Sequence, residues 1–295
     1  MCVALCWFVL PASVRAQTPQ ANPARPTVTN PATLPPVGYL QFEQGYLGSL
    51  DSPATASQYG FNFVAKIAVD QRLMLEVQTQ PFAQSRETGD VGSSGGSGDV
   101  LLGAQAVLSL PAAPSAESAK TPQTSKKAIA RPTVSVAYLG RVHAGTTPDI
   151  DQGGYANSVL LLVSGDVGKF HYDSNYVVNE QTDTESSPMT GAGAVLRRAQ
   201  FAQTLSVNHP VGSDKLQLSV ELYHFTQPLV HATAAGRYVA RANLVDGLLA
   251  LSYALRPNLV LDGGLSHGFT STSTRWQSFA GFTYLLPHRL WPGRS

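Results

Sequence analysis

The sequence predicts an all-β protein: a transmembrane, antiparallel, up-and-down β-barrel of about 12 strands in a bacterial outer membrane. Only 13% of the 295 residues are charged, about half of the fraction usual in soluble domains. Beyond residue 16, apolar and polar residues alternate, and no apolar run approaches the roughly 18 residues of a membrane-spanning helix. Long and short links alternate between these runs, as in barrels with one rim in the periplasm. A soluble β-sandwich is the alternative.

Residues 1–16 have the features of a secretory signal peptide. Residues 4–10 form a short apolar core, and residues 14–16 offer a cleavage site. No Lys or Arg precedes the core, which is unusual for such a segment and leaves the true start site open. Both cysteines, Cys2 and Cys6, fall in this segment. We therefore expect a mature protein without disulfides or thiolate metal sites.

Residues 17–37 form a proline-rich leader, which can neither hold a helix nor donate a full ladder of hydrogen bonds. Two arrangements are open. We favour a free periplasmic tether. The alternative is that the leader folds back into the barrel and partly occludes it. The leader is long enough for this, because an extended proline-rich chain spans roughly 3.1 Å per residue and the membrane band of a barrel is about 25 Å tall.

Alternating runs predict the strands of the barrel, which spans residues 38–286 and is followed by a C-terminal tail, 287–295. In one run, for example, Leu216, Leu218 and Val220 alternate with polar residues. Each run has about 10 residues, which is enough for a tilted strand to cross a bilayer. The predicted strands are 38–47, 58–68, 72–82, 98–109, 132–142, 155–165, 168–178, 200–209, 215–226, 241–254, 258–268 and 276–286.

The links between the runs separate into two classes, which we assign to the two rims of the barrel. The short links, assigned to the periplasmic rim, are 69–71, 166–167, 210–214 and 255–257. The long, polar links, assigned to the outer rim, are 48–57, 83–97, 143–154, 179–199, 227–240 and 269–275. Residues 110–131 break the rule, since this long link falls on the periplasmic side. Their Ala/Ser/Pro/Lys composition favours a disordered excursion over an error in strand assignment.

Polar faces of the strands must turn to the lumen, because unpaired polar groups in hydrocarbon cost several kcal/mol. The charged residues on those faces are therefore candidates for lining the lumen. Because their signs are mixed, we expect many of them to pair with one another across the interior; a pore lining that sets selectivity is the alternative. The candidates are Lys66, Glu76, Arg141, Lys169, His171, Asp173, Glu221, Asp246 and Asp262.

One kind of twelve-stranded barrel is a membrane phospholipase, so catalytic and metal sites are also possible in a barrel of this size. That chemistry needs a Ser activated by a nearby His. His171 and Ser174 form the closest such pair, but residues three apart on a strand point to opposite faces. The histidines show no metal-ligand spacing. We therefore expect no enzyme activity, no metal and no other cofactor.

Two stretches resemble a known family. Residues 29–45, TNPATLPPVGYLQFEQG, resemble the first segment of outer-membrane proteins called meta-pathway of phenol degradation or transporter-like proteins, and residues 98–105, GDVLLGAQ, resemble a strand that recurs in them. The resemblance implies an outer-membrane channel for hydrophobic or aromatic compounds, and it supplies no catalytic or binding residues. The tail after Leu286 departs from the terminal aromatic that is usual in such barrels.

These observations lead us to expect an outer-membrane channel for small molecules, including hydrophobic or aromatic ones. The alternatives are a structural or adhesive barrel with a sealed lumen and binding outer loops, and, more remotely, a membrane lipid hydrolase. The expected partners are outer-membrane lipid, the barrel-assembly machinery during insertion, and an unidentified solute. The net charge of +1 gives no basic field for nucleic acid.

Overall fold

The structure is a computed structural model that describes residues 19–52, 55–87, 93–110, 131–146, 155–186, 193–233 and 236–291. Within these residues no helix is long and apolar enough to cross a membrane. The strands are β1 (Leu40–Leu50), β2 (Thr55–Ala68), β3 (Leu73–Glu87), β4 (Ser94–Gly96), β5 (Val100–Ser109), β6 (Thr133–His143), β7 (Tyr155–Val167), β8 (Phe170–Ser186), β9 (Gly193–Val211), β10 (Ser213–Thr233), β11 (Gly236–Arg256), β12 (Leu259–Gly268) and β13 (Trp276–Leu285).

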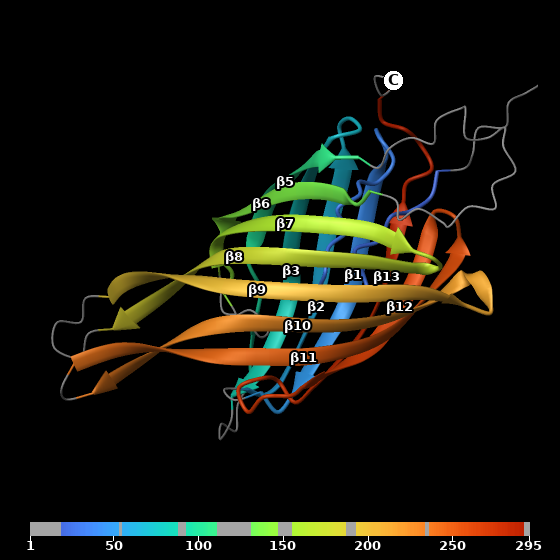
Figure 1. Cartoon of the computed structure of the whole chain (residues 1–295). Coiled ribbons are helices and arrows are strands. Elements are labelled where there is room, and N and C mark those ends of the chain that lie inside the picture. The colour runs from blue at the N-terminus through green and yellow to red at the C-terminus, as the bar shows by residue number, and fades with distance from the viewer. Residues whose placement is uncertain are drawn as a thin grey trace, which may run out of the picture.

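The strands form one closed antiparallel sheet (Figure 1). Along the ring each strand pairs with the next, and β1 closes the barrel by pairing with β13, from Gln41 opposite Leu285 to Leu50 opposite Trp276. The short β4 pairs only with the outer part of β3 and is not one of the ring strands. Twelve strands therefore make the barrel, which confirms the predicted fold class.

Every predicted run overlaps one ring strand, but β8, β9, β10 and β11 extend furthest beyond their predicted runs. The hairpins β8–β9 and β10–β11 continue as paired strands to Ser186 opposite Gly193 and to Thr233 opposite Gly236. Most of the predicted loops 179–199 and 227–240 is therefore strand, and in Figure 1 these hairpins project beyond the rest of the barrel. Backbone pairing can continue into water, where a strand no longer needs an apolar face, so the alternation that marks a strand is lost there.

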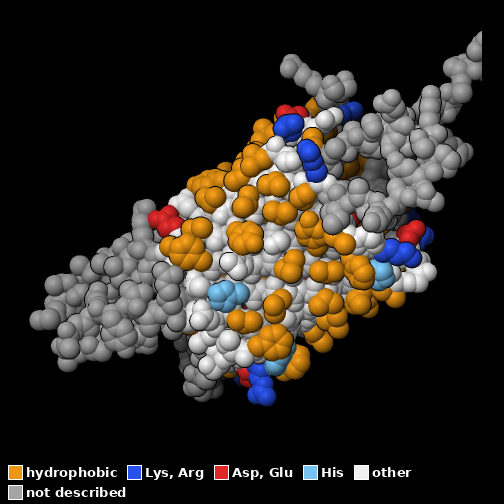
Figure 2. All heavy atoms as spheres, in the orientation of Figure 1, with side chains coloured by type: hydrophobic (Ala, Val, Ile, Leu, Met, Phe, Trp, Pro, Cys, Tyr) orange, Lys and Arg blue, Asp and Glu red, His pale blue; other side chains and the backbone are white. Residues whose placement is uncertain are grey.

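The two faces of the wall differ as a membrane barrel requires. On β7, Leu161 is 41% exposed on the outside, whereas Leu160 and Leu162 are buried inside. On β11, Leu249 is 58% exposed and Leu248 is buried. Figure 2 shows the outward apolar side chains spread over the visible face of the barrel. This surface would be costly in water and suits contact with lipid.

The chain beyond β13 folds back onto the end of the barrel that carries the short turns. Leu290 donates its backbone N–H to the carbonyl of Gly38, and Arg289 donates to the carbonyl of Val37 at 3.1 Å. The indole N–H of Trp291 reaches the carbonyl of Val69 in the β2–β3 turn. The described part of the tail thus holds the start of β1 in place. Residues 111–130, most of the predicted excursion, lie outside the described residues.

Candidate functional site: the barrel lumen

The proline-rich leader lies inside the barrel. Its backbone and side chains form hydrogen bonds with inward-facing residues of strands spaced around the wall, from β12 through β10, β8, β7 and β6 to β5. The free tether favoured by the sequence is therefore not the arrangement found. Prolines have no backbone N–H, so the leader cannot pair as a full strand. Side chains of the wall supply many of its hydrogen bonds instead.

Arg25 anchors the leader to the wall at β12. Its Nη2 lies 3.0 Å from Oδ1 of Asp262, and its Nε lies 3.2 Å from the same oxygen. The guanidinium covers Gly45 and Gly281, which are opposite each other on β1 and β13. A Cβ on Gly45 would lie 2.2 Å from Cζ of Arg25. The two glycines therefore leave the space that Arg25 needs to reach Asp262.

Glu221 holds the middle of the leader. Its carboxylate accepts hydrogen bonds from the backbone N–H of Val28 at 2.8 Å and from that of Thr29 at 2.7 Å. The hydroxyl of Thr29 contacts both Glu221 and Thr204 of β9. Glu221 is only 2% exposed. Its negative charge is thus balanced by donors of the leader, since a buried carboxylate without such donors would be costly.

The next residues of the leader bind the opposite wall. Asn30 and Asn175 of β8 make a reciprocal pair, in which each donates one N–H to the other at 2.6 and 2.8 Å. The backbone N–H of Ala32 donates to Ser164 of β7, and its carbonyl accepts from Ser135 of β6. Gln105 of β5 donates to the same carbonyl at 3.1 Å.

The leader closes on itself near β1. Asn22 exchanges two hydrogen bonds with Gln41, and its side-chain amide also donates to the carbonyl of Thr33 at 3.0 Å. The backbone N–H of Ala24 reaches Glu43, which is also paired with Lys66 at 2.9 Å. Residues 22–33 therefore form a loop, tied at its ends, that lies across the lumen near the rim of short turns.

The lumen contains an apolar band that the sequence analysis missed. Two clusters of buried side chains form it, and Val177 packs against both. The first cluster is Ala202, Tyr223, Phe225, Leu244, Leu248, Ala250 and Phe279, and the second is Ala32, Leu101, Ala137, Leu139, Leu160 and Leu162. The sequence carries a signal for this band in runs such as 159–163 and 248–251, which are apolar on both faces of a strand. The wall at β2 and β3 is polar instead, with Gln80 donating to Asn62.

The comparisons with known proteins agree with this architecture. The family described as "Putative MetA-pathway of phenol degradation" matches residues 24–286, which include most of the leader loop and the whole ring. The chain belongs to this family. A search of curated protein sequences found no match.

Solved structures show the fold of this family member. An outer-membrane channel from Pseudomonas putida F1 is similar with a TM-score of 0.55 and 13% identity, over 86% of this chain and 98% of that one. The NanC porin is similar with a TM-score of 0.51 and 9% identity, over 84% of this chain and 100% of that one. With the apolar outer surface, they show an outer-membrane β-barrel and a bacterial outer-membrane location.

The predicted lumen residues of this family member fall into three groups. Lys66, Glu76, Asp173, Glu221, Asp246 and Asp262 are buried in the interior, each less than 10% exposed. Two lie toward the rims: Arg141 pairs with Asp99 near the rim of long links, and His171 lies between Asp166 and Asp173 near the rim of short turns. Lys169 is a correction. It is exposed in the β7–β8 turn rather than on the strand face.

These charges are balanced differently from the expectation. One pair of two candidates is seen, His171 with Asp173, at 3.3 Å. Asp262 and Glu221 are balanced by the leader, which the analysis of strand faces could not supply. Lys66 is balanced by Glu43, an inward residue of predicted strand 38–47 that the candidates did not include. The leader brings its own donors into the lumen, so the wall does not have to be self-neutral.

The hydroxyl-bearing residues near His171 do not form a nucleophile–base pair. Ser174 donates to the backbone carbonyl of Thr204. Ser164 donates to Asp173 at 2.5 Å and accepts from the leader, so its proton is directed to the carboxylate and not to the imidazole. Among the described residues no cluster of three His, Cys, Asp or Glu could hold a metal ion.

Proposed function

We propose that this protein is an outer-membrane channel for small hydrophobic or aromatic molecules. The observation that carries the proposal is the apolar band inside the lumen, which lies beside the leader loop. Barrels that pass water-soluble solutes have polar interiors. A lumen lined by leucine and phenylalanine side chains suits an apolar solute. Such a solute gains free energy when it leaves water for an apolar lining.

The width of the barrel fits a solute of this size. Twelve strands enclose more space than the filled interior of eight strands and less than the aqueous channel of sixteen to eighteen. Residues 22–33 fill much of that space near the periplasmic rim, so we infer that passage requires the leader loop to move. The description of the family and the solved outer-membrane channel of the same fold support the proposed channel function. We further propose that the barrel-assembly machinery inserts the chain.

Uptake of an aromatic hydrocarbon tests the proposal. Cells that express the protein should accumulate labelled toluene faster than cells that lack it. Leu162→Asn and Leu248→Asn place polar groups in the two clusters of the band and should slow uptake. Gln58→Asn, on the polar β2 wall, is the matched control and should leave it unchanged. Uptake equal to that of cells without the protein would instead favour a sealed structural barrel.

A further inference from the structure

Each of the four short turns places an exposed cation beside a large apolar residue. At the β2–β3 turn Arg72 precedes Leu73, and at the β7–β8 turn Lys169 precedes Phe170. The tail, which lies at the same end of the barrel, repeats the arrangement. The remaining pairs are Lys215 with Leu216, Arg256 with Leu255, and Arg289 with Leu290. The same two residue types therefore recur side by side around this rim.

In the turns, the apolar member of the pair lies at the edge of the lipid-facing surface. Leu73 begins the exposed row that Leu75 and Val77 continue on β3, and Leu255 ends the row of Leu251 on β11. The cation next to it is thus the first charged group beyond the hydrocarbon. Long Lys and Arg side chains at such positions reach the interface. In Figure 2 the Lys and Arg side chains of the visible described residues lie toward the ends of the barrel and not on its apolar middle.

The rim of short turns carries more positive than negative charge. Asp70 is engaged in its own turn, where it accepts the backbone N–H groups of Arg72 and Leu73 at 2.7 and 2.9 Å. Asp166 pairs with His171 at 2.8 Å. Only these two and a third exposed carboxylate oppose the cations among the described residues of this rim. The cations are Arg72, Arg131, Lys169, Lys215, Arg256 and Arg289, and the carboxylates are Asp70, Asp166 and Asp214.

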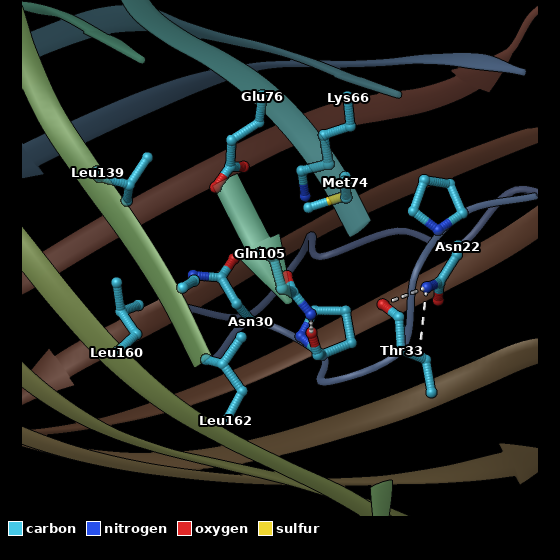
Figure 3. Close-up of a pocket in the computed structure, with 13 residues that line it drawn as sticks. Asn22, Asn30, Thr33, Lys66, Met74, Glu76, Gln105, Leu139, Leu160 and Leu162 are labelled. Carbon is cyan, nitrogen blue, oxygen red and sulfur yellow. Dashed lines mark hydrogen bonds between the residues drawn. The ribbon is translucent and has the colours of Figure 1, made fainter. Parts of the chain in front are cut away.

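Cations in other parts of the described chain are balanced by carboxylates. Inside the barrel Lys66 pairs with Glu43 at 2.9 Å and lines one pocket with Glu76 (Figure 3). At the end with the long links, the described cationic side chains are matched by an equal number of carboxylates. They are Arg86, Arg141 and Arg275 against Asp51, Asp99 and Glu180. The cations of the short-turn rim, by contrast, form no ion pair with any described residue.

We propose that the rim of short turns is a binding surface for the phosphate groups of anionic phospholipids in the surrounding leaflet. Each cation contacts a lipid phosphate, and the apolar residue beside it lies against the acyl chains. The pair therefore favours a lipid over a soluble anion, which has no acyl chain to offer. Basic side chains near a membrane surface attract anionic lipids in this way. The binding holds the barrel at a fixed depth in the bilayer, and it does not depend on which solute passes.

Spin-labelled lipids test this surface. The full-length protein is refolded into phosphatidylcholine vesicles with a trace of spin-labelled phosphatidylglycerol or phosphatidylcholine, and electron spin resonance measures how strongly each label associates with the protein. The wild type should prefer phosphatidylglycerol by up to about fivefold, the ratio that about 1 kcal/mol per cation gives. The preference should shrink in 1 M salt, where charges are screened beyond about 3 Å.

Removing the cations shows whether the preference comes from this rim. A variant with four substitutions, Arg72→Gln, Lys169→Gln, Lys215→Gln and Arg256→Gln, should associate with the two lipids about equally. Two matched pairs of arginines refine the test, with folding verified by heat-modifiable mobility on a gel. Arg72→Gln with Arg256→Gln should lower the preference, whereas Arg86→Gln with Arg275→Gln, at the opposite end, should leave it unchanged.

Three results would overturn the proposal. They are an absence of preference in the wild type, a full preference in the fourfold variant, and an equal loss from the two pairs of arginines. The first result would favour an acidic soluble protein as the partner of the rim, and the last would assign the preference to exposed arginines in general. The channel function stands in each case, because toluene uptake measures it separately.

Discussion

Glu221 and Thr29 share the most connected contact between the leader and the barrel wall. The carboxylate of Glu221 accepts both the backbone N–H and the hydroxyl of Thr29, at 2.7 and 2.5 Å, and it accepts the N–H of Val28 as well. Three donors of the leader therefore depend on one side chain. A single substitution of Glu221 in β10 should therefore weaken the binding of the leader to the wall.

Glu221→Ala should release the leader from the wall. The substitution leaves two backbone N–H groups without acceptors, each costing about 1–3 kcal/mol when it stays buried. The leader can recover hydrogen bonds only by leaving its seat for water. A cysteine introduced at Thr27 should then react faster with a water-soluble maleimide than the same cysteine in the wild-type background. Equal labelling rates would mean that Glu221 does not hold the leader.

Arg25 and Asp262 should behave as a coupled pair. Arg25→Met leaves Asp262, whose side chain is 1% exposed, without its cation. Losing one partner of a buried ion pair costs about 3–5 kcal/mol, and we expect the lower end because Arg25 is partly exposed. The double variant Arg25→Met with Asp262→Leu should be more stable than Arg25→Met alone. Urea unfolding of the barrel in lipid vesicles measures both, and additive effects of the two changes would contradict the coupling.

Adjacent residues on β3 should respond oppositely to a charge. Val77 is 38% exposed on the outer face, and an arginine there should cost about 2–4 kcal/mol near the bilayer midplane. Gln78 points inward and already donates to Glu76, so Gln78→Arg should be tolerated by the fold. The fraction of protein that refolds into vesicles measures the difference. Similar losses from both variants would show that this strand does not face lipid on one side.

The two rims should differ in their access from outside the cell. Ser94 is exposed in the link between β3 and β5, and Ser213 is exposed at the β9–β10 turn. Since long links face outward, a cysteine at Ser94 should label on intact cells with an impermeant reagent, and one at Ser213 should label only after lysis. Strong labelling of Ser213 on intact cells would reverse the assigned topology.

The number of ring strands was predictable because an outward face in lipid imposes strict alternation, as in Leu216, Leu218 and Val220. The outer parts of β8 to β11 were not, since strands in water need no apolar face. The contacts between the leader and the wall could not be predicted either, because they join residues far apart in sequence, such as Arg25 and Asp262.

Single-channel conductance in planar lipid bilayers measures how far the leader occludes the pore. Residues 19–35 are removed while the residues before them are kept, and folding is verified by heat-modifiable mobility on a gel. Because residues 22–33 cross the lumen and bind the wall from β12 to β5, we expect a larger conductance in the shortened protein than in the full-length protein. An unchanged conductance in a folded, inserted barrel would contradict it.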